Sequence, residues 1–202
     1  MEDPCCDVLV LGIGNLLWAD EGFGVRCVEH LAAQWQVPEG VTVMDGGTQG
    51  LYLLPYVQGA KRLIVFDAID YGLPPGTMKR VEGDEVPRFM GAKKMSLHQT
   101  GFQEVIAAAD LTGQLPESLL LIGVQPEELE DYGGSLRPVV KARLDDAVAM
   151  AVVQLRDWGH AVERRESRVG AGDTALGMAV YEAGRPSADA ASRIGDDRFM
   201  AA

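Results

Sequence analysis

Four continuous apolar runs constrain the fold more strongly than any other feature of the sequence. They read DVLVLGIG (7–14), VTVMD (41–45), RLIVFD (62–67) and SLLLIGV (118–124). An apolar run without alternation is typical of a strand buried on both faces, as in a parallel sheet covered by helices. The runs therefore predict a single-domain α/β fold, with three layers (α/β/α) around a twisted, mostly parallel central sheet.

The segments between these runs predict the covering helices. Residues 20–36, 101–113 and 139–158 each place apolar side chains at helical spacing. Residues 75–83 alternate weakly between flanking Pro and Gly residues, which predicts an edge or hairpin strand. Residues 83–97 are typical of a loop. Strands that alternate with helices in this way favour the layered arrangement.

The composition predicts one folded domain followed by a tail. A chain of 202 residues that is 47% hydrophobic can build one sizeable core, which we expect within residues 1–158. Gly, Ala, Ser, Arg and Asp dominate residues 159–202, which predicts a flexible C-terminal tail. The three cysteines (Cys5, Cys6 and Cys27) are odd in number, which favours reduced thiols over a disulfide framework.

The charge of the chain argues against several classes of partner. A formal net charge of -12 disfavours nucleic acid and anionic membrane surfaces, since both attract Lys and Arg. No run of about 18 apolar residues indicates a membrane span. The acidic N-terminus, MEDPCCD, does not have the form of a signal peptide. These features predict a cytoplasmic protein.

Acidic residues recur where the predicted strands end, and one histidine can join them. Glu21 follows the first strand, Asp45 the second and Asp67 the third, while His98 stands just before the helix predicted at 101–113. Carboxyl ends of parallel strands meet along one edge, where α/β folds bind ligands. Glu21, Asp67 and His98 supply two oxygens and one imidazole nitrogen, a set compatible with zinc or nickel. Each residue alone is also compatible with a purely structural role.

A dinucleotide site is the main alternative for the first of these loops. Gly12 and Gly14 begin a GxGxxG pattern, but Leu17 occupies the third glycine position. Asp20 and Glu21 would also stand where the pyrophosphate should bind and would repel it. The residues therefore favour a cation over a nucleotide. The glycine-rich turn DGGTQG (45–50) is compatible with a tight turn and with close approach of a passing peptide.

Six motifs follow one another along the chain: LGIGNLLWADEGFGV, DGGTQG, IVFDAID, PGT, SLHQTGF and LIGVQPEELE. Together they resemble the [NiFe]-hydrogenase maturation endopeptidases, most closely those serving membrane-bound uptake hydrogenases, and the resemblance covers about residues 8–158. It implies an enzyme that removes the C-terminal extension of a nickel-loaded hydrogenase large-subunit precursor. The precursor is then the expected partner, with neither nucleic acid nor membrane involved.

The resemblance also implies roles for the acidic edge residues. Glu21, Asp67 and His98 match the metal-binding positions of the family. The nickel belongs to the precursor, and no organic cofactor is expected. Asp45 or Asp67 is the expected catalytic carboxylate, acting as general base, while nickel serves either as a recognition handle or as a Lewis acid. A precursor-holding chaperone that does not cleave remains the alternative from another functional class.

Overall fold

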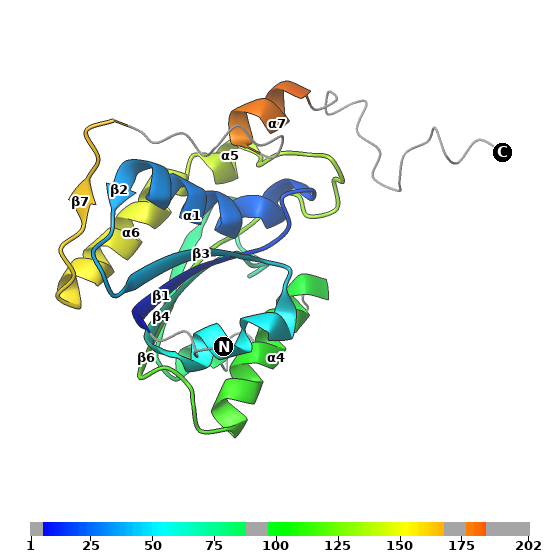
Figure 1. The fold of residues 1–202 in the computed structure, drawn as a ribbon. Helices are drawn as coiled ribbons and strands as arrows, with labels where there is room; N and C mark the ends of the chain where they lie inside the picture. The colour runs from blue at the N-terminus through cyan, green and yellow to red at the C-terminus, as the bar shows by residue number, and fades with distance from the viewer. Residues whose placement is uncertain (1–5, 88–96, 168–176, 185–202) are drawn as a thin grey trace.

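A five-stranded sheet forms the centre of the molecule (Figure 1). The computed structural model describes residues 6–87, 97–167 and 177–184. The strand order is β3-β1-β4-β6-β5, in which the first four strands are parallel and β5 is an antiparallel edge strand. The strands are β1 (Cys6–Ile13), β3 (Val41–Gly47), β4 (Ala60–Ala68), β5 (Met78–Glu82) and β6 (Ser118–Val124). This architecture confirms the mostly parallel sheet and the edge strand predicted from the sequence.

Helices cover both faces of the sheet, as Figure 1 shows with α1 and α6 on one side and α4 on the other. The first layer contains α1 (Phe23–Gln34), α5 (Pro138–Lys141) and α6 (Leu144–Asp157). The second contains the 3-10 helix η2 (Gly50–Leu53), α2 (Leu54–Gln58) and α4 (Leu97–Leu111). A further 3-10 helix, η1 (Ala19–Gly22), leads into α1. The three-layer prediction is therefore confirmed.

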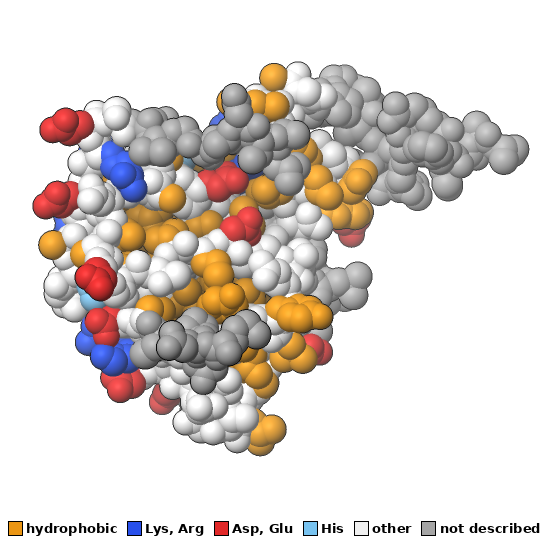
Figure 2. Space-filling model, viewed as in Figure 1, with side chains coloured by type: hydrophobic (Ala, Val, Ile, Leu, Met, Phe, Trp, Pro, Cys, Tyr) orange, Lys and Arg blue, Asp and Glu red, His pale blue; other side chains and the backbone are white. Residues whose placement is uncertain are grey.

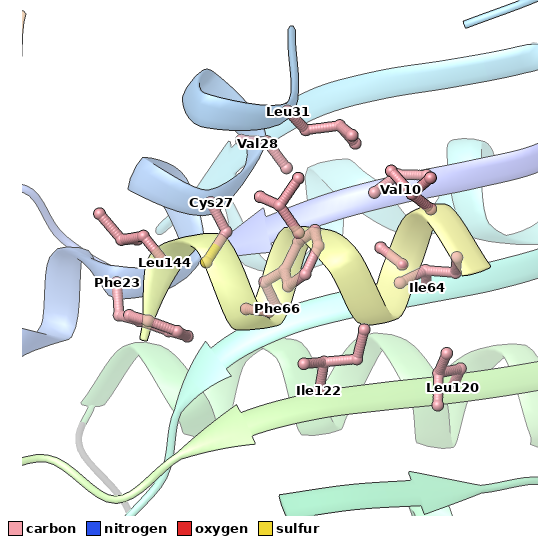
Figure 3. Packing of buried hydrophobic residues seen from close by; sticks show 14 of the residues in the cluster. Val10, Phe23, Cys27, Val28, Leu31, Ile64, Phe66, Leu120, Ile122 and Leu144 are labelled. Carbon is pink, nitrogen blue, oxygen red and sulfur yellow. The ribbon is translucent and has the colours of Figure 1, made fainter. Parts of the chain in front are cut away.

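Alternate residues along each strand fill two separate cores. Ile64 and Phe66 of β4 pack with Val10 of β1 against α1 and α6, as Figure 3 shows. Their neighbours on β4 pack on the other side, against α2 and α4. Cys27 lies among the apolar side chains of the first core, and burial raises the pKa of its thiol well above the usual value. Its environment is that of a core residue.

Helix α1 lies unusually close to the ends of β1 and β4. A Cβ atom on Gly24 would overlap the carbonyl oxygens of Ile13 and Phe66, and one on Gly12 would overlap that of Gly24. Only glycine allows this contact between helix and sheet. The sequence pattern GxGxxG pointed to a missing third glycine at Leu17, but Gly24 is the residue that provides the close packing.

The helices predicted at 20–36 and 139–158 differ from those observed. The helix expected at 20–36 begins as η1, continues as α1 and ends at Gln34, because Trp35 and Gln36 form the short strand β2 (Trp35–Gln36). The helix expected at 139–158 is divided, since α5 ends at Lys141 and α6 starts at Leu144. Most of the loop predicted at 83–97 lies outside the described residues.

Parts of the predicted tail contact the domain. Strand β7 (Glu163–Arg164) pairs antiparallel with β2, and Arg165 donates its backbone N–H to the carbonyl of Gln34 at 2.8 Å. Helix α7 (Met178–Gly184) lies near α5 (Figure 1). Residues 168–176 and 185–202 lie outside the described residues, so flexibility of the tail stays a prediction.

Candidate functional site

The candidate site lies at the carboxyl ends of the parallel strands. The chain passes from β1 outward to β3 on one side and later to β4 and β6 on the other, so the strand order reverses between β1 and β4. Open α/β sheets bind ligands at this reversal point, where the loops of neighbouring strands diverge. The loops that follow β1, β3, β4 and β6 all reach this edge.

Glu21 is brought to this edge by a sharp return of the chain. It belongs to η1 and is only 7% exposed. Gly14 has φ +135°, and a Cβ at this position would overlap the carbonyl oxygen of Glu21. Ala19 also has a positive φ of 29°, which is strained for a residue with a side chain. The loop thus folds tightly over the end of β1 and buries Glu21 there.

Asp67 is buried at the end of β4, where it is 1% exposed. It pairs in register with Gly123 of β6, so both positions face the same side of the sheet. A side chain on Gly123 would overlap the hydroxyl of Tyr71, which therefore lies beside Asp67. Burial, and secondarily the charge of Asp67, raises the pKa of Tyr71. The backbone N–H of Tyr71 donates to Gln125 Oε1 at 2.7 Å, which fixes this loop.

His98 lies in the first turn of α4, so the prediction that it precedes a helix was wrong. The helix begins at Leu97, and near its start Gly101 approaches Gly50 of η2. The His98 backbone therefore lies at the same edge as Glu21 and Asp67, but its side chain is outside the described structure. Among the side chains that are described, no three His, Cys, Asp or Glu residues could hold a metal ion. The three-residue ligand set stays a prediction.

Asp45 lies apart from Asp67. It pairs in register with Gly12 and thereby with Phe66, so it faces α1, whereas Asp67 faces the α4 layer. The two positions are separated by strand β1, which corresponds to about 10 Å. Desolvation raises the pKa of the Asp45 carboxyl, opposed by the Gly47 N–H and by the charge of Arg26. Asp45 nevertheless reaches solvent beside the glycine-rich turn.

Asp20 has a structural role that the sequence did not predict. Its buried carboxylate accepts three backbone N–H groups, from Glu127 at 2.8 Å, Glu128 at 2.9 Å and Arg137 at 2.7 Å. Burial raises the pKa of this carboxyl, and the three donors oppose the shift. Asp20 thereby attaches η1 to the segment 125–137, which we call the β6–α5 loop. The only signal in the sequence was a second acid beside Glu21.

Further contacts join the β6–α5 loop to the loop after β1. Trp18 and Tyr132 form an isolated antiparallel bridge, and their rings meet edge to face with centroids 5.3 Å apart. The backbone N–H of Gly133 donates to the carbonyl of Leu17 at 2.8 Å. Together with Asp20, these contacts make the two loops one wall of the site.

Exposed apolar side chains surround the edge. Each loop contributes at least one: Leu17 is 38% exposed, Leu51 53%, Leu73 39% and Tyr132 47%. On the face drawn in Figure 2, hydrophobic side chains form a band between the α1 and α4 layers. Apolar surface of this kind is typical of sites that bind peptides or proteins.

Comparison with known proteins assigns the fold to a family. The family model described as "Hydrogenase maturation protease" matches residues 25–154. This range contains β3, β4, β6 and α4, and with them Asp45, Asp67 and His98. The chain belongs to the hydrogenase maturation protease family.

Related proteins cover nearly the whole of this protease. The hydrogenase expression/formation proteins HupD of Thiocapsa roseopersicina and HoxM of Cupriavidus necator are 59% and 58% identical. They align with 98% and 96% of this chain and with 91% and 98% of their own lengths. The solved hydrogenase maturating endopeptidase HybD of Escherichia coli is 40% identical and superposes with a TM-score of 0.74, over 78% of this chain and 97% of its own. The resemblance inferred from the motifs is confirmed, as is the prediction of an endopeptidase.

The remaining histidines of the protease lie away from the site. His30 Nε2 lies 3.0 Å from Asp145 Oδ1, an interaction that joins α1 to α6. His160 follows the end of α6 and lies near Asp7 at the start of β1. Neither is placed to join Glu21 and Asp67. In the described part of the chain, no helix is both long and apolar enough to span a membrane.

Proposed function

We propose that this protease removes the C-terminal extension of a hydrogenase large-subunit precursor, and that Glu21, Asp67 and His98 bind the precursor's nickel. The observation that carries the proposal is the burial of two carboxyl groups, Glu21 and Asp67, at the adjoining ends of β1 and β4. Attraction between a carboxylate and a cation is stronger where water is excluded. A nickel ion presented by the precursor would compensate the cost of burying both charges.

Nickel is part of the substrate in this proposal. Bound to the precursor and to the protease together, it can align the scissile peptide or polarise its carbonyl. Asp67, as a metal ligand, holds the precursor in place. Asp45 reaches solvent and lies beside the glycine-rich turn, so it is the carboxylate better placed to accept a proton from water. The cytoplasmic location stays a prediction from the sequence.

The test is cleavage of a purified, nickel-loaded precursor by wild type and by Glu21→Gln, Asp67→Asn and His98→Ala. We expect each variant to lose processing roughly 100-fold or more, since changes outside the ligand set of metal sites alone cost about 10–100-fold. Glu39→Gln, which alters an exposed acid at the amino edge of the sheet, and His30→Ala are the matched controls and should process normally. Asp45→Asn should slow cleavage while precursor binding persists.

Each alternative predicts a different result in the same assay. Normal processing by all three variants would show that the nickel ligands lie elsewhere. A wild-type protein that binds the precursor without shortening it would support the chaperone. Saturable NAD binding that Glu21→Gln leaves unchanged would support the dinucleotide site. Nickel-free precursor should remain uncut.

A further inference from the structure

Helix α7, from the C-terminal segment, is fastened to the β6–α5 loop and to α5. Glu182 is the principal contact: Lys141 Nζ lies 2.7 Å from both of its carboxylate oxygens, and Ser135 Oγ donates to Oε1 at 2.9 Å. Tyr181 donates its hydroxyl to the carbonyl of Gly134 at 3.3 Å. Helix α7 is thus held by an ion pair to α5 and by two hydrogen bonds to the β6–α5 loop.

Tyr181 also connects α7 with α1. The guanidinium of Arg26 lies over the Tyr181 ring, 5.8 Å from its centroid. Arg26 is only 2% exposed, and its charge acts on Asp45 across the first layer. Contact with an aromatic face is favourable for such a buried cation. Helix α7 therefore touches both elements that flank the site on this side of the sheet, α1 and the β6–α5 loop.

The same loop also holds η1. Asp20 takes three N–H groups from the loop, and Glu21 is the next residue. The contacts form a continuous series. Helix α7 contacts Ser135 and its neighbours in the β6–α5 loop, the loop donates hydrogen bonds to Asp20, and Glu21 is the residue next to Asp20. A partly exposed ion pair such as Lys141–Glu182, at 41% and 28% exposure, adds little to overall stability. It can still decide between two positions of one surface loop, because such loops open at much lower free energy than the core.

We propose that α7 is a positioning element of the protease, which holds the β6–α5 loop and, through Asp20, keeps Glu21 in place for the nickel-loaded precursor. Glu182 and Tyr181 are positioning residues, since they act through the loop. The proposal rests on the function proposed above for Glu21. It gives the C-terminal segment a task in substrate binding.

Charge reversal in the full-length protein tests the proposal. Glu182→Lys or Lys141→Glu alone places like charges together and should detach α7. We expect KM for the nickel-loaded precursor to rise roughly tenfold, with kcat little changed, since effects transmitted to a metal site from outside its ligand set are about 10–100-fold. The double variant Lys141→Glu/Glu182→Lys should restore most of the affinity. Lys61→Glu is the control: it places a negative charge beside Asp7 at the amino edge of the sheet, away from the site, and should leave KM unchanged.

Hydrogen exchange gives a second readout that needs no activity. The amides of Glu127, Glu128 and Arg137 should exchange faster in each single variant and at the wild-type rate in the double variant. Unchanged exchange, or a KM that the double variant fails to restore, would overturn the role of α7. Absence of cleavage by wild type would instead remove the proposed function, and the exchange rates would still decide whether α7 holds the loop.

Discussion

At the scale of single residues, Asp20 and Glu21 are adjacent in the sequence but serve different parts of the molecule. The Asp20 carboxylate points into the β6–α5 loop, where backbone N–H groups occupy both of its oxygens. Glu21 lies at the ends of β1 and β4 with Asp67. A carboxylate with three amide donors is fixed, and here that fixes the loop beside the site.

Asp20→Ala should destabilise the protease by about 2–4 kcal/mol, because it leaves buried N–H groups without acceptors. Asp20→Asn keeps one acceptor oxygen and should cost less. Urea unfolding measures the difference. The control is Glu127→Gln, an exposed side chain whose change should stay within about 0.5 kcal/mol. An Asp20→Ala protein as stable as this control would mean that the loop finds other partners.

The sequence predicted only part of these residue roles. Glu21 and Asp67 follow apolar strands, and in a parallel sheet that position alone brings them to one edge. The role of Asp20 could not be predicted, since its acceptor contacts join residues 107 to 117 positions apart. Gly24 was missed for the same reason: its close contact with β4 depends on how the helix packs, which local pattern does not report.

At the scale of elements, the contact of α1 with the sheet depends on Gly24. Gly24→Ala should reduce the free energy of unfolding by about 3 kcal/mol or more, because the added methyl overlaps two carbonyl oxygens at once. Gly101→Ala is the matched change in α4, where the new Cβ would lie 3.4 Å from Gly50 Cα. It should be neutral or stabilise by up to about 1 kcal/mol through helix propensity.

Thermal unfolding of the two variants compares the elements directly. Equal stability of Gly24→Ala and Gly101→Ala would show that α1 can shift away from the strands without cost. We expect instead that only the α1 variant melts early. Its far-UV circular dichroism should remain that of an α/β protein if the variant folds.

Element boundaries were harder to predict than element types. Helical spacing continues past Gln34, but Trp35 and Gln36 pair with Arg164 and Glu163, residues distant in sequence. Pairing of this kind overrides a local pattern. The break between α5 and α6 likewise leaves the apolar spacing of 139–158 intact, so nothing in that pattern reports it.

At the scale of the whole molecule, the two edges of the sheet respond to pH in opposite directions. At the amino edge, the hydrogen bond and charge of Lys61 lower the pKa of Asp7 below 3.8. At the carboxyl edge, desolvation raises the pKa of Asp45 above 3.8. Stabilisation from Asp7 is present above pH 3.8 and is lost as pH falls through its lowered pKa. The contribution of Asp45 favours the fold below pH 3.8 and is lost as pH rises through its raised pKa.

NMR titration of the side-chain carboxyl groups measures both shifts in one experiment. Asp45 should titrate above Asp7 in wild type. Arg26→Gln should raise the pKa of Asp45 further, because a nearby positive charge is removed, and should leave Asp7 unchanged. If Asp45 and Asp7 had the same pKa, the opposite effects inferred for their surroundings would be wrong.

The architecture was predictable because four buried strands and their order along the chain leave few arrangements open. Strand order and the antiparallel direction of β5 came from the structure, and so did the separation of Asp45 from Asp67. Asp45 and Asp67 lie on opposite faces of the sheet. This follows from the register, because Asp45 pairs with Gly12, Gly12 pairs with Phe66, and Asp67 is the residue after Phe66. The motif resemblance supplied the rest of the functional prediction.

The reversed direction of β5 has a consequence for how this sheet can vary. Because β5 runs backward, Glu82 lies opposite Leu120 near the start of β6, whereas α4 begins at the other edge, beside η2. Strand β5 therefore carries the chain away from the carboxyl edge, where α4 begins. A shorter β5 would leave both Asp67, at the end of β4, and the start of α4 where they are. The Glu82 end of β5, which pairs near the start of β6, can therefore vary in length far from the carboxyl ends of the strands, where Asp67 lies.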